Sequence, residues 1–142
     1  MKKIAVVYWS GTGNTEMMAL AIAEGAMKAG AEVSVLKAPD FTNEMAAGFD
    51  KIAFGCPSMG AEELEETEFE PMFRSVQGQL PGKKIALFGS YGWGDGEWMR
   101  NWQDSVQSAG AKLIAEGLIV NEQPADSDLE TCKALGEKLA EA

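Results

Sequence analysis

Residues 10–15 read Ser-Gly-Thr-Gly-Asn-Thr and stand between a short apolar run and a segment of helical composition. The apolar run, residues 4–9, has the length of a buried β-strand, and residues 16–28 are expected to form a helix. Backbone N–H groups in such a loop and in the first helical turn point towards a bound anion, and the helix dipole favours negative charge there. The stretch therefore predicts a phosphate site, with an ordinary polar turn as the alternative.

The loop lacks the motifs that bind two common phosphate ligands. Glu16 and Met17 stand where the nucleoside-triphosphate pattern starting at Gly11 needs glycine and lysine, and no lysine is nearby. Glu16 also stands where the dinucleotide pattern needs a third glycine. The loop instead offers two glycines, three hydroxyls and one side-chain amide, which suit a terminal phosphomonoester. These donors come from Ser10, Gly11, Thr12, Gly13, Asn14 and Thr15.

The rest of the chain alternates strand-like and helix-like segments. Strands are expected at residues 4–9, 32–36, 51–56, 84–89 and 112–120, and a short helix or packed loop at 39–49. Longer helices are predicted around three apolar stripes: Phe69, Met72, Phe73 and Val76; Trp98, Trp102 and Val106, ending at Gly110; and Leu129, Cys132 and Leu139 within residues 125–140. This order predicts an α/β fold, a parallel sheet with helices on both faces.

Two further loops leave the predicted sheet at the same edge as residues 10–15. Residues 90–96, Ser-Tyr-Gly-Trp-Gly-Asp-Gly, offer Trp93 as a flat surface for a planar ring, although a tryptophan folded back into the core is the alternative. Residues 57–62, Pro-Ser-Met-Gly-Ala-Glu, offer Met59 for the other face and Glu62 as an acceptor for a ring N–H. Ligands of such sheets bind at this edge. A phosphate, a stem and a large ring containing an N–H describe flavin mononucleotide (FMN).

Composition excludes several classes of function. The chain has 142 residues, which predicts a single domain over residues 1–142, and its net charge of −10 argues against nucleic acid and anionic lipid as partners. The acidity fits docking to basic proteins, and solubility alone is an equal explanation. The absence of histidine removes the commonest general base. Two distant cysteines, with no signal peptide and no membrane-length apolar run, predict a cytoplasmic protein.

Three motifs together resemble the short-chain flavodoxins of anaerobic bacteria. They are Ser-Gly-Thr-Gly-Asn-Thr at residues 10–15, Met59-Gly60 before a glutamate-rich run, and Phe-Gly-Ser-Tyr-Gly-Trp-Gly-Asp-Gly at residues 88–96. The likeness extends over essentially the whole chain. It implies a flavodoxin-like three-layer sandwich, with a five-stranded parallel sheet of strand order 2-1-3-4-5.

The resemblance also implies a role for each loop residue. Residues 10–15 would hold the phosphate, Met59 and Trp93 would flank the isoalloxazine, and Glu62 would contact ring N3. The peptide after Gly60 would reorient on reduction, so that its carbonyl accepts the flavin N5–H. The full expected set is Ser10, Gly11, Thr12, Gly13, Asn14, Thr15, Pro57, Ser58, Met59, Gly60, Ala61, Glu62, Ser90, Tyr91, Gly92, Trp93, Gly94 and Asn121, with no catalytic or metal-binding residue.

The implied function is a low-potential one-electron carrier that moves non-covalent FMN between oxidised, neutral semiquinone and hydroquinone states for redox partner proteins. A monomer is favoured. The alternatives are a small NAD(P)H-dependent quinone or flavin reductase, and a regulatory protein of the same shape. The lack of histidine and of a second nucleotide motif weighs against the reductase.

Ala61 departs from the residues that such proteins often carry at this point of the loop, which are Asp, Asn, Gly or Ser. If the reoriented turn places residue 61 at positive φ, alanine costs ~1 kcal/mol relative to glycine. Ala61→Gly is then expected to raise the oxidised/semiquinone potential.

Overall fold

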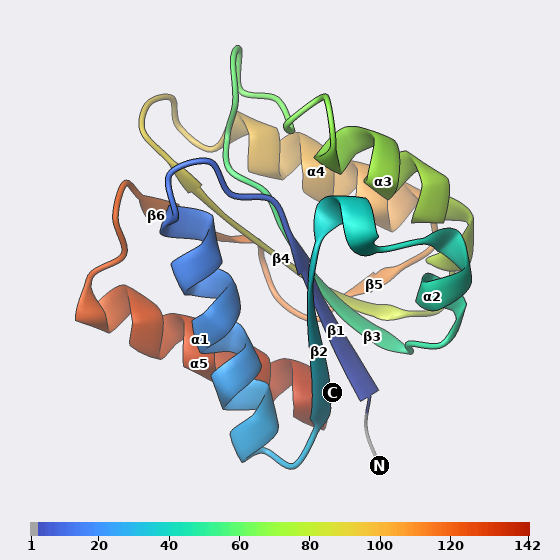
Figure 1. Cartoon of the computed structure of the whole chain (residues 1–142). Helices are drawn as coiled ribbons and strands as arrows, with labels where there is room; N and C mark the ends of the chain where they lie inside the picture. Colours follow the sequence, from blue (N-terminus) through green and yellow to red (C-terminus); the bar gives the residue numbers. More distant parts are fainter. Residues whose placement is uncertain (1–2) are drawn as a thin grey trace.

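The computed structural model describes residues 3–142 as a parallel sheet between two layers of helices (Figure 1). The strands are β1 (Lys3–Tyr8), β2 (Glu32–Lys37), β3 (Lys51–Gly55), β4 (Lys84–Tyr91), β5 (Lys112–Leu113) and β6 (Leu118–Asn121). The helices are α1 (Asn14–Lys28), α2 (Asn43–Ala47), α3 (Phe69–Val76), α4 (Glu97–Ser108) and α5 (Asp126–Glu141), with 3-10 turns at Ala38–Asp40 and Gln77–Gln79.

The strand order is β2-β1-β3-β4-β5 and every pairing in the sheet is parallel, which confirms the predicted fold class and order. The predicted last strand, residues 112–120, is instead two short strands. Both β5 and β6 pair with β4, at its beginning and at its end respectively. Between them the backbone leaves the sheet, and the N–H of Gly117 donates to Gln103 Oε1 of α4 at 2.5 Å. The place next to β4 is thus shared by two short strands, and the segment between them contacts α4.

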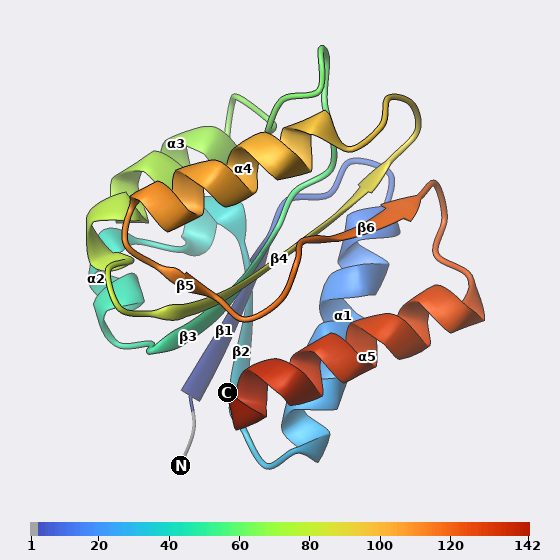
Figure 2. The ribbon, with the colours of Figure 1, turned by 180° about the vertical axis from the view of Figure 1, so that it is seen from behind.

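Two apolar cores lie on opposite faces of the sheet. One contains Ile4 and Val6 of β1 and packs under α1 and α5; the other contains Ala5 and Val7 and packs under α2, α3 and α4. Figure 2 shows the molecule from behind, with α1 and α5 together on one side of the sheet and α3 and α4 on the other. Alternate residues of one strand enter different cores, which is why the strands read as continuous apolar runs.

The predicted helical stripes are buried. Phe69, Met72, Phe73 and Val76 of α3 and Trp98, Trp102 and Val106 of α4 are all at most 6% exposed. In α5, Cys132 and Leu139 are fully buried, whereas Leu129 is half-buried. Within residues 3–142, no helix combines the length and hydropathy that crossing a membrane requires.

Candidate functional site

Three loops meet at the carboxyl edge of the sheet, after β1, β3 and β4, as the sequence predicted. Figure 1 shows all three at the same end of the molecule. They surround a cavity of about 500 Å³, a volume within the ordinary range of small-molecule sites. Its lining is Trp9, Ser10, Gly11, Thr12, Asn14, Thr15, Pro57, Ser58, Met59, Ser90, Tyr91, Gly92, Glu122 and Gln123.

The first loop ends in an exposed helix N-terminus. Gly13 adopts φ 96° immediately before α1, a conformation that glycine reaches without strain. The Ser10 hydroxyl accepts hydrogen bonds from the N–H groups of Gly13 at 3.1 Å and Glu16 at 3.3 Å. Ser10 thereby holds the loop folded around the start of α1, where backbone N–H groups and the helix dipole favour an anion.

A tyrosine beneath this loop fixes the carboxylate of the first helical turn. Tyr8 donates its hydroxyl hydrogen to Glu16 Oε2 at 2.7 Å. Burial, together with this hydrogen bond and the charge of Glu16, raises the pKa of Tyr8 to about 12. Tyr8 therefore stays a neutral donor over the working pH range and directs the Glu16 carboxylate.

The second loop contains a small hairpin. Met59 and Glu63 exchange two backbone hydrogen bonds of 2.8 Å, and between them Gly60 has φ 51° and Glu62 has φ 55°. Ala61 is not among the residues with positive φ. The strain predicted for alanine at position 61 belongs to the turn with its peptide reoriented, so it stays a prediction. In this conformation Glu62 is the non-glycine residue of the second loop that adopts the left-handed geometry.

The carboxylate of Glu62 joins the second loop to the third. Its Oε1 accepts the N–H groups of Gly96 at 3.1 Å and Glu97 at 3.0 Å, so it caps the N-terminus of α4. A Cβ built on Gly94 would lie 2.5 Å from the same carboxyl group. Glycine at position 94 thus leaves room for this contact.

The two residues predicted to flank a planar ring are exposed to solvent. Trp93 is 60% exposed and Met59 is 37% exposed, although both are large apolar side chains. The alternative of Trp93 as a core residue is therefore wrong. Trp98 is 2% exposed and donates its indole N–H to Cys56 O at 3.1 Å, so it belongs to the core as predicted.

One buried polar atom in the cavity wall has no partner. The hydroxyl of Ser58 is inaccessible to solvent, and among residues 3–142 it makes no hydrogen bond. Buried hydroxyls are nearly always paired. A ligand that presents polar atoms to this wall would pair it, so the donor set fits a nucleotide-like cofactor such as FMN: an anion at α1 and a polar ring edge near Ser58.

The sequence prediction and the cavity overlap in most positions but not all. Predicted residues that line the cavity are Ser10, Gly11, Thr12, Asn14, Thr15, Pro57, Ser58, Met59, Ser90, Tyr91 and Gly92, and predicted residues outside its lining are Gly13, Gly60, Ala61, Glu62, Trp93, Gly94 and Asn121. Sequence analysis missed Trp9, Glu122 and Gln123. Glu122 and Gln123 follow β6 at the same sheet edge, so the rule that located the other loops could have found them.

The thiols of this chain do not supply a nucleophile. Cys56 and Cys132 are free and fully buried. Burial raises the pKa of the Cys56 thiol, and burial together with Asp128 raises the pKa of Cys132 to about 12. Both cysteines are therefore protonated core residues.

The fold and the site together define an α/β protein with a small-molecule cavity among the loops at the carboxyl edge of a parallel sheet. Comparison with known proteins narrows this class: residues 6–136 match the family model "Flavodoxin". The chain is 47% identical to the flavodoxin of Megasphaera elsdenii over 98% of this chain and 99% of that protein, and 42% identical to that of Clostridium beijerinckii over 95% and 97%. The solution structure of two-electron reduced Megasphaera elsdenii flavodoxin superimposes with a TM-score of 0.89 at 45% identity, covering 98% of this chain and 99% of that one.

The chain belongs to the flavodoxin family, and it is an FMN-binding electron-transfer protein.

Proposed function

We propose that residues 1–142 act as one FMN-binding domain that carries single electrons at low potential between redox partner proteins. The observation that supports this most directly is the cavity of about 500 Å³ that runs from the N-terminus of α1 to Met59 and Tyr91. One end offers backbone donors for a phosphate. The second and third loops form the other end, and they carry the exposed side chains of Met59 and Trp93. FMN supplies the redox chemistry, and the protein binds, orients and tunes it.

The phosphate would be held by Ser10, Gly11, Thr12, Gly13, Asn14 and Thr15. Helix-terminal N–H groups and hydroxyls would neutralise it, since none of the lysines and arginines within residues 3–142 lines this cavity. Ser90, Tyr91 and Gly92 would meet the pyrimidine side of the ring, Met59 and Trp93 its two faces, and Asn121 its edge. Pro57, Ser58, Ala61 and Gly94 would complete the walls.

Two features of the second loop would tune the bound ring. Gly60 already has φ 51°, and a Cβ added there would meet none of residues 3–142 within 4 Å. We infer that the peptide after Gly60 has room to reorient and present its carbonyl to the ring. Glu62 would exchange part of its bonding with α4 for a ring N–H. The carboxylates of this chain of net charge −10 would disfavour a negatively charged reduced flavin and so lower its potential.

An anaerobic reductive titration tests the carrier against the reductase. The FMN-loaded protein is treated with NADPH and then with dithionite, and visible spectra are recorded. A carrier is inert to NADPH and passes through a blue one-electron-reduced form with dithionite. Rapid bleaching by NADPH without that form would establish the flavin or quinone reductase. Failure of the apoprotein to bind FMN would overturn both.

Partners and location follow from charge and chemistry. We propose that basic reductases and acceptors dock against the acidic protein, that neither nucleic acid nor membrane is a partner, and that the chain is a monomer. Two reduced, buried cysteines fit a cytoplasmic location. Sedimentation at several protein concentrations would detect self-association, and the salt dependence of electron-transfer rates would measure the electrostatic contribution to docking.

A further inference from the structure

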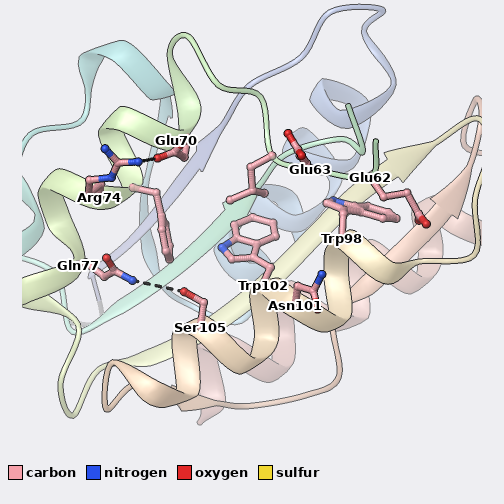
Figure 3. A pocket seen from close by; sticks show the side chains of 11 residues that line it. Glu62, Glu63, Glu70, Arg74, Gln77, Trp98, Asn101, Trp102 and Ser105 are labelled. Atoms are coloured by element: carbon pink, nitrogen blue, oxygen red, sulfur yellow. Dashed lines mark hydrogen bonds and ion pairs between the residues drawn. The ribbon is translucent and has the colours of Figure 1, made fainter. Parts of the chain in front are cut away.

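A second cavity, of about 330 Å³, lies between α3 and α4 and the end of the hairpin. Figure 3 shows its side chains coming from both helices and from the end of the hairpin, where it labels Glu62 and Glu63. Phe73, Trp98 and Trp102 provide aromatic surface, and Glu62, Glu63 and Glu70 bring three carboxylates to its walls. The FMN cavity does not include this space.

Trp102 lines this cavity and has an unpaired donor. Its side chain is 2% exposed and packs edge-on against Phe69 and Phe73, with ring centroids 5.3 and 5.9 Å away. The indole Nε1 is buried and, among residues 3–142, has no hydrogen-bond acceptor. Buried tryptophans usually pair this group, as Trp98 does with Cys56 O at 3.1 Å one turn earlier. An indole N–H can only donate, so the missing group is an acceptor.

The polar side chains next to Trp102 do not accept its indole hydrogen, so an external molecule has to supply the acceptor. Gln77 Nε2 donates to Ser105 Oγ at 3.4 Å across the cavity, a long and therefore weak bond that Figure 3 draws between the two helical segments. Neither side chain accepts the indole hydrogen. An entering molecule can displace this weak bond and bring its own oxygen to Trp102.

The charges of the walls decide the kind of molecule. Arg74 is paired with Glu70, and Glu62 accepts the N–H groups of Gly96 and Glu97. Glu63 is thus a wall carboxylate without a cation among the ion pairs of residues 3–142. A ligand carboxylate would be repelled, whereas an amide N–H would be attracted. The aromatic walls favour a ligand with a flat ring. The cavity volume lies near the lower end of the range for small-molecule sites, which favours a small ligand.

We propose that the cavity between α3 and α4 is a binding site for a small neutral aromatic amide. Its carbonyl accepts the Trp102 indole N–H, its ring lies among Phe73, Trp98 and Trp102, and its N–H groups are attracted by the negative charge of Glu63. The site does not depend on the electron-carrier proposal, because it shares no cavity with FMN.

Benzamide is the probe that tests the proposal, with benzoate as an anionic molecule of the same shape and toluene as a ring without an acceptor. The oxidised, FMN-loaded protein is labelled with nitrogen-15, and its amide and indole signals are followed during each titration. Benzamide is expected to shift the Trp102 indole signal, and the backbone amides of residues 62–64, in a saturable way. Benzoate and toluene are expected to bind at least about threefold more weakly, since benzoate lacks the N–H groups and toluene lacks both the acceptor and the N–H groups.

Two variants locate the site. Trp102→Phe keeps the ring and removes the donor, so it identifies the indole signal and should weaken benzamide binding about three- to tenfold. Ser105→Phe places a ring at the exposed mouth of the cavity and should abolish binding, and it provides the test if Trp102→Phe does not fold. The proposal is wrong if benzamide causes no saturable shift, if toluene binds as well as benzamide, or if either folded variant binds benzamide as the parent protein does.

Discussion

The hydroxyls of Thr15 and Ser90 lie 3.0 Å apart and form a buried hydrogen bond between the start of α1 and the end of β4. Thr15 Oγ1 also accepts the backbone N–H of Ser90 at 3.4 Å, and the two residues are 1% and 5% exposed. The loop expected to hold the phosphate and the loop expected to hold the flavin ring are thus joined directly at the floor of the cavity. The Thr15 hydroxyl serves this connection, in addition to any contact with the cofactor.

We expect Thr15→Val to weaken FMN binding about tenfold and to lower the free energy of unfolding by ~1–2 kcal/mol. Valine has the shape of threonine but leaves both the Ser90 hydroxyl and its N–H without a buried partner. Quenching of FMN fluorescence measures the affinity, and urea unfolding of the apoprotein measures the stability. Thr15→Ser retains the hydroxyl and should stay close to the parent in both. Equal affinity of the valine and serine variants would contradict the role given to this bond.

We predict that Glu62 contributes to the free energy of unfolding of the apoprotein and that this contribution depends on salt. Its carboxylate accepts two N–H groups at the positive end of α4, and Glu62→Gln should lower the stability of the apoprotein by ~0.5–1 kcal/mol at low ionic strength. The loss should shrink as salt is added. Glu63→Gln, a substitution at the exposed neighbouring residue, is the matched control. A stability loss equal in both variants would argue against the cap.

Much of the fold could be predicted because its physical causes are local in sequence. Strands buried on both faces, such as β1 and β3, must be continuously apolar, and a helix buried along one stripe must repeat its apolar residues as α3 does. The cavity could be located because parallel strands bring their carboxyl ends to one edge. That rule predicts that the three loops at this edge, residues 10–15, 57–62 and 90–96, meet at one cavity.

What the sequence could not reveal depends on contacts between distant segments. Between β5 and β6 the N–H of Gly117 bonds to Gln103 of α4, and this partner, distant in the sequence, is not visible in the local pattern of residues 112–120. The positive φ at Glu62 rather than Ala61 accompanies the contacts of Glu62 with Gly96 and Glu97. Trp9 continues an apolar run in the sequence, and its position in the cavity wall appears only when the loops are assembled.

Two glycines allow α1 and α5 to pack closely. A Cβ on Gly25 would lie 2.0 Å from the carbonyl oxygen of Lys133, and one on Gly136 would lie 2.0 Å from that of Ile22. Each alanine substitution must push the helices apart, so we expect a net loss of ~1–3 kcal/mol in stability despite the better helix propensity of alanine.

The double variant Gly25→Ala/Gly136→Ala should cost less than the two single changes together, because one separation of the helices relieves both clashes. Chemical denaturation of the four proteins in the cycle measures this. Gly78→Ala is the control, since a Cβ there meets nothing within 4 Å, and its stability should match or exceed the parent. Additive losses at positions 25 and 136 would show that the clashes are relieved separately.

Glu65 gives a prediction for the dependence of stability on pH. The residue is 5% exposed, and its carboxylate accepts the N–H groups of Thr67 at 2.9 Å and of Glu68 and Phe69 at 2.8 Å, together with the hydroxyl of Thr67. Burial acts to raise the pKa of Glu65, but these hydrogen bonds outweigh it and hold the pKa below its usual value of 4.5. The folded protein therefore binds the proton less readily than the unfolded chain does.

A carboxyl group with a lowered pKa stabilises the fold above its unfolded pKa, and this stabilisation disappears as the pH falls through the folded value. Glu65→Gln should therefore lower the free energy of unfolding by roughly 1.5–3 kcal/mol at neutral pH, because an amide cannot replace the charged acceptor at the start of α3. Below pH 4.5 the difference between parent and variant should shrink steadily. Urea unfolding of the apoproteins across this range measures it, with exposed Glu66→Gln as the control. A difference that stays constant from neutral to acid pH would show that Glu65 acts through its shape rather than its charge.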